Sequence, residues 1–235
     1  MKPETYSRYA AIFDTFSNER ISPAVAEFTD LVAGYLAPGV AVADIGGGTA
    51  YFTRRLLEKV KGISLTFVEP SPEMMAIART RLPADAVMLE KGVEEALAGM
   101  APQNVFIFLR SLYSFYSDLE SYRQLARRLS DKTLPHGLVA IFEMPGKYEI
   151  AAIKEYFFNN VALLDLGEDD FDTAWLKLEP ILEEYNRSID DGVFTIFDRD
   201  QMVALFGEAG FELAYHNNVT TYIFRKSAQA TPARG

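Results

Sequence analysis

Short apolar runs alternate with amphipathic stretches along the middle of the chain. The apolar runs predict strands, and the amphipathic stretches between them predict helices. The predicted strands cover residues 40–45, 63–69, 86–90, 104–109 and 138–143, and the predicted helices cover residues 50–61, 72–81, 93–99 and 118–130. Strands that alternate with helices indicate a parallel sheet. The run 105–109 is apolar at every position, as a strand covered by helices on both faces requires.

Helical patterns precede and follow this alternation. Residues 3–17 and 23–36 predict two helices, and the second begins with Pro23, which is favoured in a first helical turn. Beyond strand 138–143 the chain is mostly helical over 148–164 and 172–186. A further helix at 198–208 is followed by strands at 211–216 and 219–225, which the Asn217-Asn218 turn joins into a hairpin.

These elements predict an α/β fold with a doubly wound, Rossmann-like sheet of seven strands. The sheet is expected to be mostly parallel, with an antiparallel terminal strand and a helical cap inserted after the fifth strand. Residues 1–37 would form N-terminal helices, residues 38–146 and 191–226 the sheet domain, and residues 147–190 the cap. Residues 227–235 are expected to be a disordered tail.

A glycine-rich turn follows the first predicted strand, in the run Asp44-Ile45-Gly46-Gly47-Gly48-Thr49. Glycine lets the backbone approach a ligand where a Cβ atom would clash. The second predicted strand ends in Glu69, whose carboxylate only accepts hydrogen bonds and therefore suits two ribose hydroxyls. The two strand ends predict a nucleoside-binding site.

These residues resemble the class I S-adenosylmethionine-dependent methyltransferases of the small-molecule type. That family carries an acidic residue before a glycine-rich turn, D-x-G-x-G-x, which residues 44–49 match with Gly47 in place of the usual Cys or Ala. It also carries a second acidic residue at the end of strand 2, which Glu69 matches. The resemblance runs on to residue 224 and implies S-adenosylmethionine as methyl donor and S-adenosylhomocysteine (SAH) as product.

The resemblance implies a set of cofactor-binding positions. Asp44 would orient the methionine amino group, Glu69 would hold the ribose, and Met74 would flank the adenine. Arg110 would contact the cofactor carboxylate or the substrate, and the helix carrying Tyr9 would close over the cofactor, unless that helix only packs as core. The full set is Asp44, Gly46, Gly47, Gly48, Glu69, Pro70, Met74, Gly92, Val93, Glu94, Leu109, Arg110 and Tyr9.

The segment after the third strand departs from the family pattern. Family members often place an aspartate there that accepts from the adenine amino group, whereas this chain has Val93. Adenine recognition would then fall to the backbone of Gly92 and Val93, or to Glu94. The alternative is that Glu94 only favours the start of a helix.

A dinucleotide-binding Rossmann domain is the rival interpretation of the glycine turn. Its G-x-G-x-x-G fingerprint needs a third glycine for close packing of helix on strand, and Tyr51 stands at that position. The acidic residue two positions before Gly46 also fits the methyl-donor family better. The pattern therefore favours S-adenosylmethionine over a nicotinamide or flavin cofactor.

Four residues are candidates for substrate contact or proton transfer. Tyr113 and Tyr116 follow strand 4, Glu143 ends strand 5, and His216 ends the sixth strand. Each could instead be structural, the tyrosines by packing under the cap. His136 lies in a predicted turn on the opposite side of the sheet and is expected to be structural.

The amino-acid composition limits the classes of ligand and partner that the protein is expected to bind. A net charge of −10 and a pI near 4.8 argue against nucleic acid, because such binding depends on Lys and Arg at phosphates. The absence of cysteine excludes disulfides and thiolate metal sites, and no metal is expected. No apolar stretch reaches the roughly 18 residues of a membrane span. These features predict a cytoplasmic protein with a small-molecule substrate.

The predicted cap is rich in aromatic side chains, which suit a small apolar or aromatic metabolite, methylated on O, N or C. The same side chains could form the cap's own core or the interface of a homodimer. Two alternatives for function remain: another reaction at the same cofactor site (carboxymethyl, aminopropyl or cyclisation chemistry), or a nonenzymatic regulator or partner subunit that binds S-adenosylmethionine. The aromatic residues are Tyr148, Tyr156, Phe157, Phe158 and Trp175.

Overall fold

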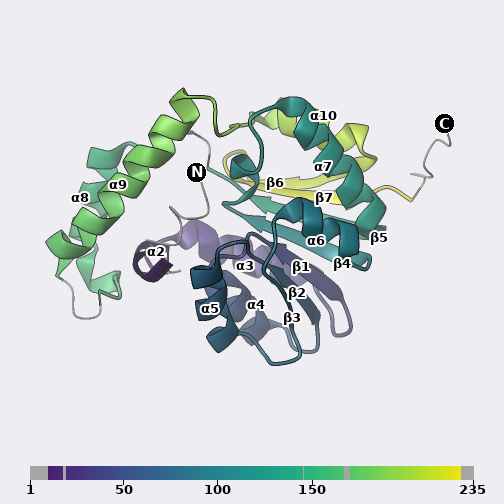
Figure 1. Cartoon of the computed structure of the whole chain (residues 1–235), viewed down its shortest axis with the longest axis horizontal. Helices are drawn as coiled ribbons and strands as arrows, with labels where there is room; N and C mark the ends of the chain where they lie inside the picture. Colours follow the sequence, from purple (N-terminus) through teal and green to yellow (C-terminus); the bar gives the residue numbers. More distant parts are fainter. Residues whose placement is uncertain (1–9, 18–19, 145, 167–169, 229–235) are drawn as a thin grey trace.

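The computed structural model describes residues 10–17, 20–144, 146–166 and 170–228. Within these residues, seven strands form one sheet in the order β3-β2-β1-β4-β5-β7-β6 (Figure 1). Strands β1 to β5 pair in parallel, and β7 runs antiparallel to both of its neighbours. The predicted fold class is confirmed. The strands are β1 (Ala41–Ile45), β2 (Ser64–Val68), β3 (Val87–Leu89), β4 (Gln103–Leu109), β5 (Thr133–Phe142), β6 (Phe211–His216) and β7 (Thr221–Lys226).

Helices cover the sheet on both faces (Figure 1). Along β4, Val105 and Ile107 point to a core shared with α3 and α4, while Phe106 and Phe108 point to a second core shared with α6, α7 and α10. Both faces of the strand are therefore dry, which explains its unbroken apolar run. The helices of the first face are α3 (Pro23–Tyr35), α4 (Tyr51–Lys59) and α5 (Pro72–Arg81); those of the second are α6 (Val93–Gly99), α7 (Leu119–Lys132) and α10 (Arg199–Glu208).

Local capping chemistry fixes where several helices begin. The Ser71 hydroxyl accepts from the backbone N–H of Met74 at the start of α5, and Asp118 accepts from Ser121 at the start of α7. Asp198 and Gln201 form a reciprocal capping box at the start of α10. These bonds satisfy backbone N–H groups that have no partner within the helix.

The cap stands to one side of the sheet and consists of α8 (Ile150–Asn159), a short 3-10 helix η2 (Val161–Leu163) and α9 (Phe171–Asp190) (Figure 1). Helix α2 (Ala10–Ser17) belongs to the same core, because Ile12 and Phe16 pack with the side chains of α9. Trp175 of α9 is buried at the centre of this core, with its ring 6.4 Å from that of Phe16. The N-terminal helix thus joins the cap to the sheet domain.

Strand β5 begins at Thr133, five residues before the predicted start at 138. The segment 134–137 was expected to be a turn because it contains Pro135 and Gly137. Instead it continues the strand as an irregularity, where the pairing with β4 shifts register and His136 takes a left-handed conformation (φ 61°). Of the predicted tail 227–235, Ser227 is ordered, because its backbone N–H donates to the carbonyl of Gly210 (3.0 Å). Residues 229–235 and the first part of the predicted N-terminal helix, including Tyr9, lie outside the described residues.

None of the described helices combines the length and the apolar character that a membrane crossing needs.

Candidate functional site

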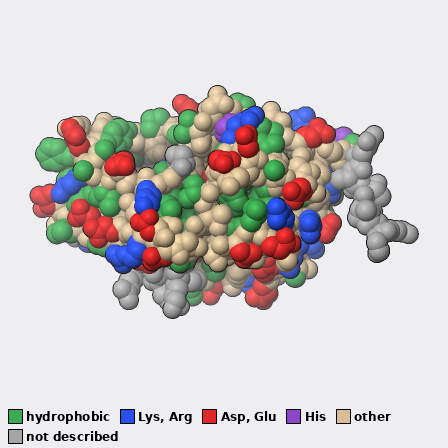
Figure 2. All heavy atoms as spheres, turned by 90° about the horizontal axis from the view of Figure 1, so that it is seen from above, with side chains coloured by type: hydrophobic (Ala, Val, Ile, Leu, Met, Phe, Trp, Pro, Cys, Tyr) green, Lys and Arg blue, Asp and Glu red, His purple; other side chains and the backbone are tan. Residues whose placement is uncertain are grey.

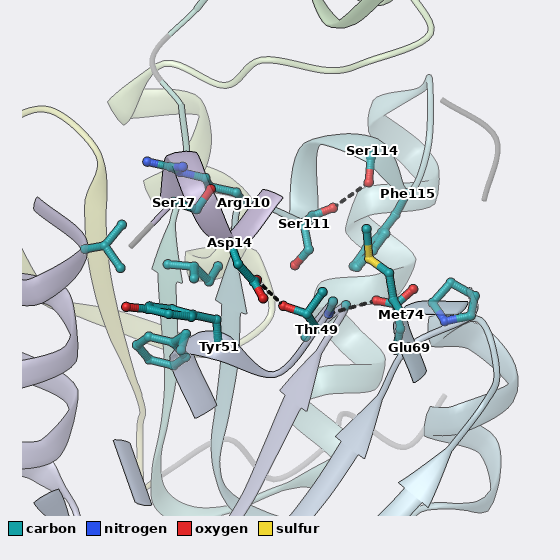
Figure 3. Close-up of a pocket in the computed structure, with 17 residues that line it drawn as sticks. Asp14, Ser17, Thr49, Tyr51, Glu69, Met74, Arg110, Ser111, Ser114 and Phe115 are labelled. Carbon is teal, nitrogen blue, oxygen red and sulfur yellow. Dashed lines mark hydrogen bonds between the residues drawn. The ribbon is translucent and has the colours of Figure 1, made fainter. Parts of the chain in front are cut away.

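Glu69 fastens the end of β2 to the glycine turn, residues 46–48. Its Oε2 accepts from the backbone N–H of Gly48 (2.9 Å), and its Oε1 accepts from the backbone N–H of Ser71 (2.8 Å), as Figure 3 shows for the first of these bonds. Burial raises the pKa of Glu69, and the two N–H donors lower it. A carboxylate has about four acceptor positions, so Glu69 can accept further hydrogen bonds from a ligand.

The glycines of the turn are required by the protein itself. A Cβ atom on Gly47 would lie 2.2 Å from Cε2 of Phe67, and one on Gly46 would lie 2.7 Å from Cβ of Ser111. Gly46 and Gly48 also have positive φ angles of 71° and 60°. The turn is therefore held tightly against the ends of β2 and β4.

Asp44, at the end of β1, is buried beneath this turn with 1% of its surface exposed. Its Oδ2 accepts from the hydroxyl of Thr53, while its Oδ1 has no hydrogen-bond partner among the described residues. Burial is the main reason that the pKa of Asp44 rises to about 7; the Thr53 bond lowers it, and the charge of Glu69 raises it further. A buried carboxylate oxygen without a donor is unusual and leaves room for a donor from a ligand.

A cavity of about 170 Å³, here called the glycine-turn cavity, lies above the carboxyl ends of β1, β2 and β4. Glu69 and Met74 lie on one side of it, and Arg110 and Ser17 on the other (Figure 3). Helix α2 borders it through Asp14 and Ser17. The full lining is Asp14, Ser17, Val25, Gly46, Gly47, Gly48, Thr49, Tyr51, Phe52, Glu69, Pro70, Met74, Leu109, Arg110, Ser111, Ser114 and Phe115.

A second cavity of about 380 Å³, here called the cap cavity, lies between α2, α8, α9 and the segment after β4. Arg110 and Ser17 line both cavities, so the two meet at these residues. The remaining side chains are mostly aromatic and aliphatic. They are Phe16, Ile21, Ser22, Tyr113, Met144, Tyr148, Ala152, Ile153, Tyr156, Phe157, Leu178, Ile181, Leu182 and Tyr185.

Solved structures resemble the chain in fold at low sequence identity. The methyltransferase CalO1 of calicheamicin biosynthesis, in its SAH-bound form, is 17% identical over 87% of this chain and 54% of its own, with a TM-score of 0.56. The cyclopropane synthase MmaA2 from Mycobacterium tuberculosis is 17% identical over 86% and 66%, with a TM-score of 0.55. The N-methyltransferase NodS from Bradyrhizobium japonicum WM9 is 12% identical over 90% and 99%, with a TM-score of 0.55.

The chain has the fold of class I S-adenosylmethionine-dependent methyltransferases. The sheet order and the antiparallel β7 agree with this likeness, so the predicted resemblance is confirmed at the level of the fold. No family model matches the sequence, and no curated protein matches it. The chain spans about half the length of CalO1 and two thirds of that of MmaA2.

Most of the residues that the methyltransferase resemblance implied at the cofactor meet in the glycine-turn cavity. Asp44 lies just below it, 2.9 Å from where a Cβ of Gly47 would stand. Gly92, Val93 and Glu94 do not line the cavity, and Glu94 instead accepts from the Tyr116 hydroxyl and pairs with Arg128. Those that line it are Gly46, Gly47, Gly48, Glu69, Pro70, Met74, Leu109 and Arg110.

The four predicted candidates for chemistry are not brought together. Tyr113 lines the cap cavity, whereas Tyr116 lines neither cavity. Glu143 lies behind Tyr113 in a third cavity of about 20 Å³, where the backbone N–H of Leu112 donates to its Oε1 (2.7 Å). Burial raises the pKa of Glu143 to about 8. His216 is outside both cavities and stacks on the ring of Tyr222 at the sheet edge (4.3 Å).

The cap aromatics also separate into two groups. Tyr148, Tyr156 and Phe157 line the cap cavity, but Trp175 lies in the cap's core, and Phe158 is 62% exposed. The described residues contain no group of three or more His, Asp or Glu side chains placed to hold a metal ion.

Several residues that line the glycine-turn cavity were not predicted. Thr49, Tyr51 and Phe52 closely follow the glycine turn, and Ser111 follows Arg110, so their places in the sequence were usable hints. The others reach the cavity through contacts between distant segments, or through the irregular segment after β4, and neither leaves a periodic signal. These residues are Asp14, Ser17, Val25, Thr49, Tyr51, Phe52, Ser111, Ser114 and Phe115.

Proposed function

We propose that the protein is an S-adenosylmethionine-dependent methyltransferase that acts on a small, apolar or aromatic molecule. The observation that carries this proposal is the meeting of two unlike cavities at Arg110 and Ser17. One is bounded by the glycine turn and Glu69, and the other is mostly apolar. A donor in the first and an acceptor in the second would face each other at the junction.

The residues around the glycine turn fit the methyl donor. Glu69 would accept from the two ribose hydroxyls with the acceptor positions that Gly48 and Ser71 leave open. Asp44 has one buried oxygen to which no described residue donates, and this oxygen suits the ammonium group of the methionine moiety. Met74 is 5% exposed at the edge of the cavity, where its thioether would pack against the adenine.

S-adenosylmethionine, when bound, supplies a methyl group already activated on a sulfonium. The chain therefore contributes alignment and exclusion of water more than bond activation. Helix α2 borders both cavities through Ser17, and the aromatic residues of the cap cavity would hold the acceptor against the junction. The low polarity of these walls strengthens any charged contact inside.

Titration calorimetry with S-adenosylmethionine and SAH tests the cofactor site. Wild type should bind both at micromolar levels, and Glu69→Gln should lose at least about tenfold in affinity, or about 1.4 kcal/mol. Glu58→Gln, which changes an exposed carboxylate on α4, is the matched control and should bind as wild type. Absence of binding by folded wild-type protein would refute the proposal.

Turnover separates the methyltransferase from the alternatives. Transfer of a labelled methyl group to a panel of apolar acceptors, with SAH as the second product, supports methyl transfer. Products that carry a carboxymethyl or aminopropyl group would indicate other chemistry at the same site. Tight cofactor binding without any turnover would favour a nonenzymatic regulator.

A further inference from the structure

The lining of the cap cavity carries positive charge and no negative charge among the described residues. Arg110 is the only charged side chain among the described residues that line it, and none of these residues is acidic. The other polar groups are hydroxyls of serine and tyrosine. A cation bound there would meet only the positive charge of Arg110, whereas an anion would be attracted to it.

Arg110 is placed to receive such an anion. Its backbone is left-handed (φ 53°), which directs the residue away from the course of β4, and its guanidinium lies 5.5 Å from the ring of Phe142. Its Nη2 donates a long hydrogen bond to Ser22 Oγ (3.4 Å), but its buried Nε finds no acceptor in the described part of the chain. Within the described residues Arg110 forms no ion pair, so a buried N–H donor is left for a ligand.

The nearest acidic group does not cancel this charge. Glu143 interacts electrostatically with Arg110, yet burial raises the pKa of Glu143 to about 8, so most of it is protonated at neutral pH. Tyr148 is also neutral there, because the pKa of a phenol is ordinarily about 10 and burial raises that of Tyr148 further. Arg110 therefore faces the junction of the cavities with most of its positive charge unopposed.

The described residues place no histidine and no free carboxylate at this junction. Among the described residues lining the two cavities there is no histidine, and the carboxylates are Asp14 and Glu69. Asp14 is bound by Thr49 and Arg81, while Glu69 lies on the side of the glycine-turn cavity away from Arg110 (Figure 3). An acceptor that needs no deprotonation suits such a site.

We infer that the substrate is an apolar carboxylic acid, whose carboxylate Arg110 binds at the junction of the two cavities and which is methylated to its methyl ester. This inference rests on the proposed function. A carboxylic acid is ionised at neutral pH without a base, whereas a phenol is not. One carboxylate oxygen forms a bond to the methyl carbon as the carbon–sulfur bond breaks and its electron pair stays on sulfur. A sulfonium and a carboxylate thus give a thioether and an ester, and no proton moves.

The net charge of −10 opposes the approach of an anion from solution, and acidic side chains are spread over the face in Figure 2. Salt limits this effect, because exposed charges are screened beyond about 8 Å at physiological ionic strength. Arg110 acts at contact distance inside a low-polarity cavity, where screening is weaker. The positive charge of Arg110 therefore determines the ligand preference of the cavity more than the net negative charge of the protein does.

Matched ligands test the inference in the full-length protein. Biphenyl-4-carboxylate, biphenyl-4-carboxamide and 4-hydroxybiphenyl have similar size and differ in charge, and a series of fatty acids with their amides extends the set. Calorimetry in the presence of saturating SAH should show each acid binding about tenfold more tightly than its amide or phenol. Methyl transfer, followed by mass spectrometry, should yield methyl esters of the acids.

Variants connect this preference to Arg110. Arg110→Gln should abolish the difference between acid and amide while SAH binds as in wild type, and Arg110→Lys should keep part of it. Arg199→Gln, which removes an exposed guanidinium on α10 outside both cavities, is the matched control and should retain the full difference. Thermal unfolding confirms that each variant folds.

Three results would overturn the inference. Amides that bind as well as acids across the set would show that charge is not recognised. A loss of SAH affinity in Arg110→Gln as large as in Glu69→Gln would place Arg110 on the cofactor instead. If wild type binds SAH but binds none of the acids, the inferred substrate class is wrong and the proposed cofactor site is retained. If wild type does not bind SAH, the proposed function itself is refuted.

Discussion

The carboxylate of Asp14 accepts a hydrogen bond from the hydroxyl of Thr49 at 2.5 Å, which ties helix α2 to the glycine turn. The same carboxylate pairs with Arg81 at 2.5 Å, and Arg81 donates to the Thr49 carbonyl at 3.0 Å. Three segments far apart in sequence thus meet at the rim of the glycine-turn cavity. The arrangement holds the α2 side of the cavity in place.

Removing this tie should loosen the cofactor site. Asp14→Ala removes a hydrogen bond and a partly buried ion pair, together worth about 1–2 kcal/mol, so the Kd for SAH should rise about tenfold, mainly through faster dissociation. Stopped-flow displacement measures the rate. Asp30→Ala breaks an exposed ion pair with Lys59 and serves as the control. An equal change in the SAH dissociation rate in both variants would show that the Asp14 contacts do not stabilise the cofactor site.

The affinity for SAH should rise with pH through neutrality. The pKa of Asp44 is about 7, so at pH 5.5 its carboxyl is protonated and cannot pair with the ammonium group of the ligand, whereas by pH 7.5 it is mostly ionised. A single such group gives up to about tenfold per pH unit below its pKa. Asp44→Asn should bind weakly with a much flatter profile. Parallel profiles for the two proteins in calorimetry would show that Asp44 is not the titrating group.

The stability of the ligand-free protein should fall as pH rises from about 4.5 to 8. Burial raises the pKa of Glu143 from 4.5 to about 8, so the folded state holds a proton that the unfolded state releases. The stabilisation is complete below the unfolded pKa and is lost through the folded pKa, by a few kcal/mol. In Glu143→Gln, urea unfolding at pH 5 and pH 8 should differ less than in wild type. An unchanged difference would place the effect elsewhere, for example at Asp44.

Two glycine substitutions should have opposite effects. Gly47→Ala places a Cβ atom 2.2 Å from the Phe67 ring and should reduce the free energy of unfolding by at least about 1–3 kcal/mol. Gly34→Ala lies in α3 with no atom within 4 Å of the new Cβ, so it should add about 0.5–1 kcal/mol. Denaturant titration compares them. An equal change in the free energy of unfolding in both variants would mean that the glycine turn relaxes to accommodate the new Cβ atom.

The seven strands and the mostly parallel sheet followed from the sequence because alternating strands and helices leave a periodic signal, whereas the order of the strands was not predicted. Asp44, the glycine turn and Glu69 were equally visible, since they lie within one strand–turn–helix unit and the next strand end. The start of β5 was missed because Pro135 and Gly137 are typical of turns, and only pairing with β4 shows that the strand continues through them.

The rest of the site depends on contacts that no local pattern encodes. Glu94 was a candidate for recognition of the adenine, yet the fold places it beside Tyr116 and Arg128. The Tyr116 hydroxyl donates to its carboxylate, and Arg128 forms an ion pair with it. Asp14 joins the site across 35 residues of sequence. Arg110 was identified, but its position at the meeting point of two cavities is a property of the packed cap.

Strand β7 lies between β5 and β6 although it is the last of the described strands in sequence order. During synthesis, β1 to β5 can assemble while the ribosome still holds residues 221–226, and the edge of β5 then carries unpaired backbone N–H and C=O groups. An open edge of this kind is a template for pairing with another chain. A chain in which residues 221–226 have not yet paired therefore exposes a template for aggregation, and insertion of β7 between β5 and β6 removes it.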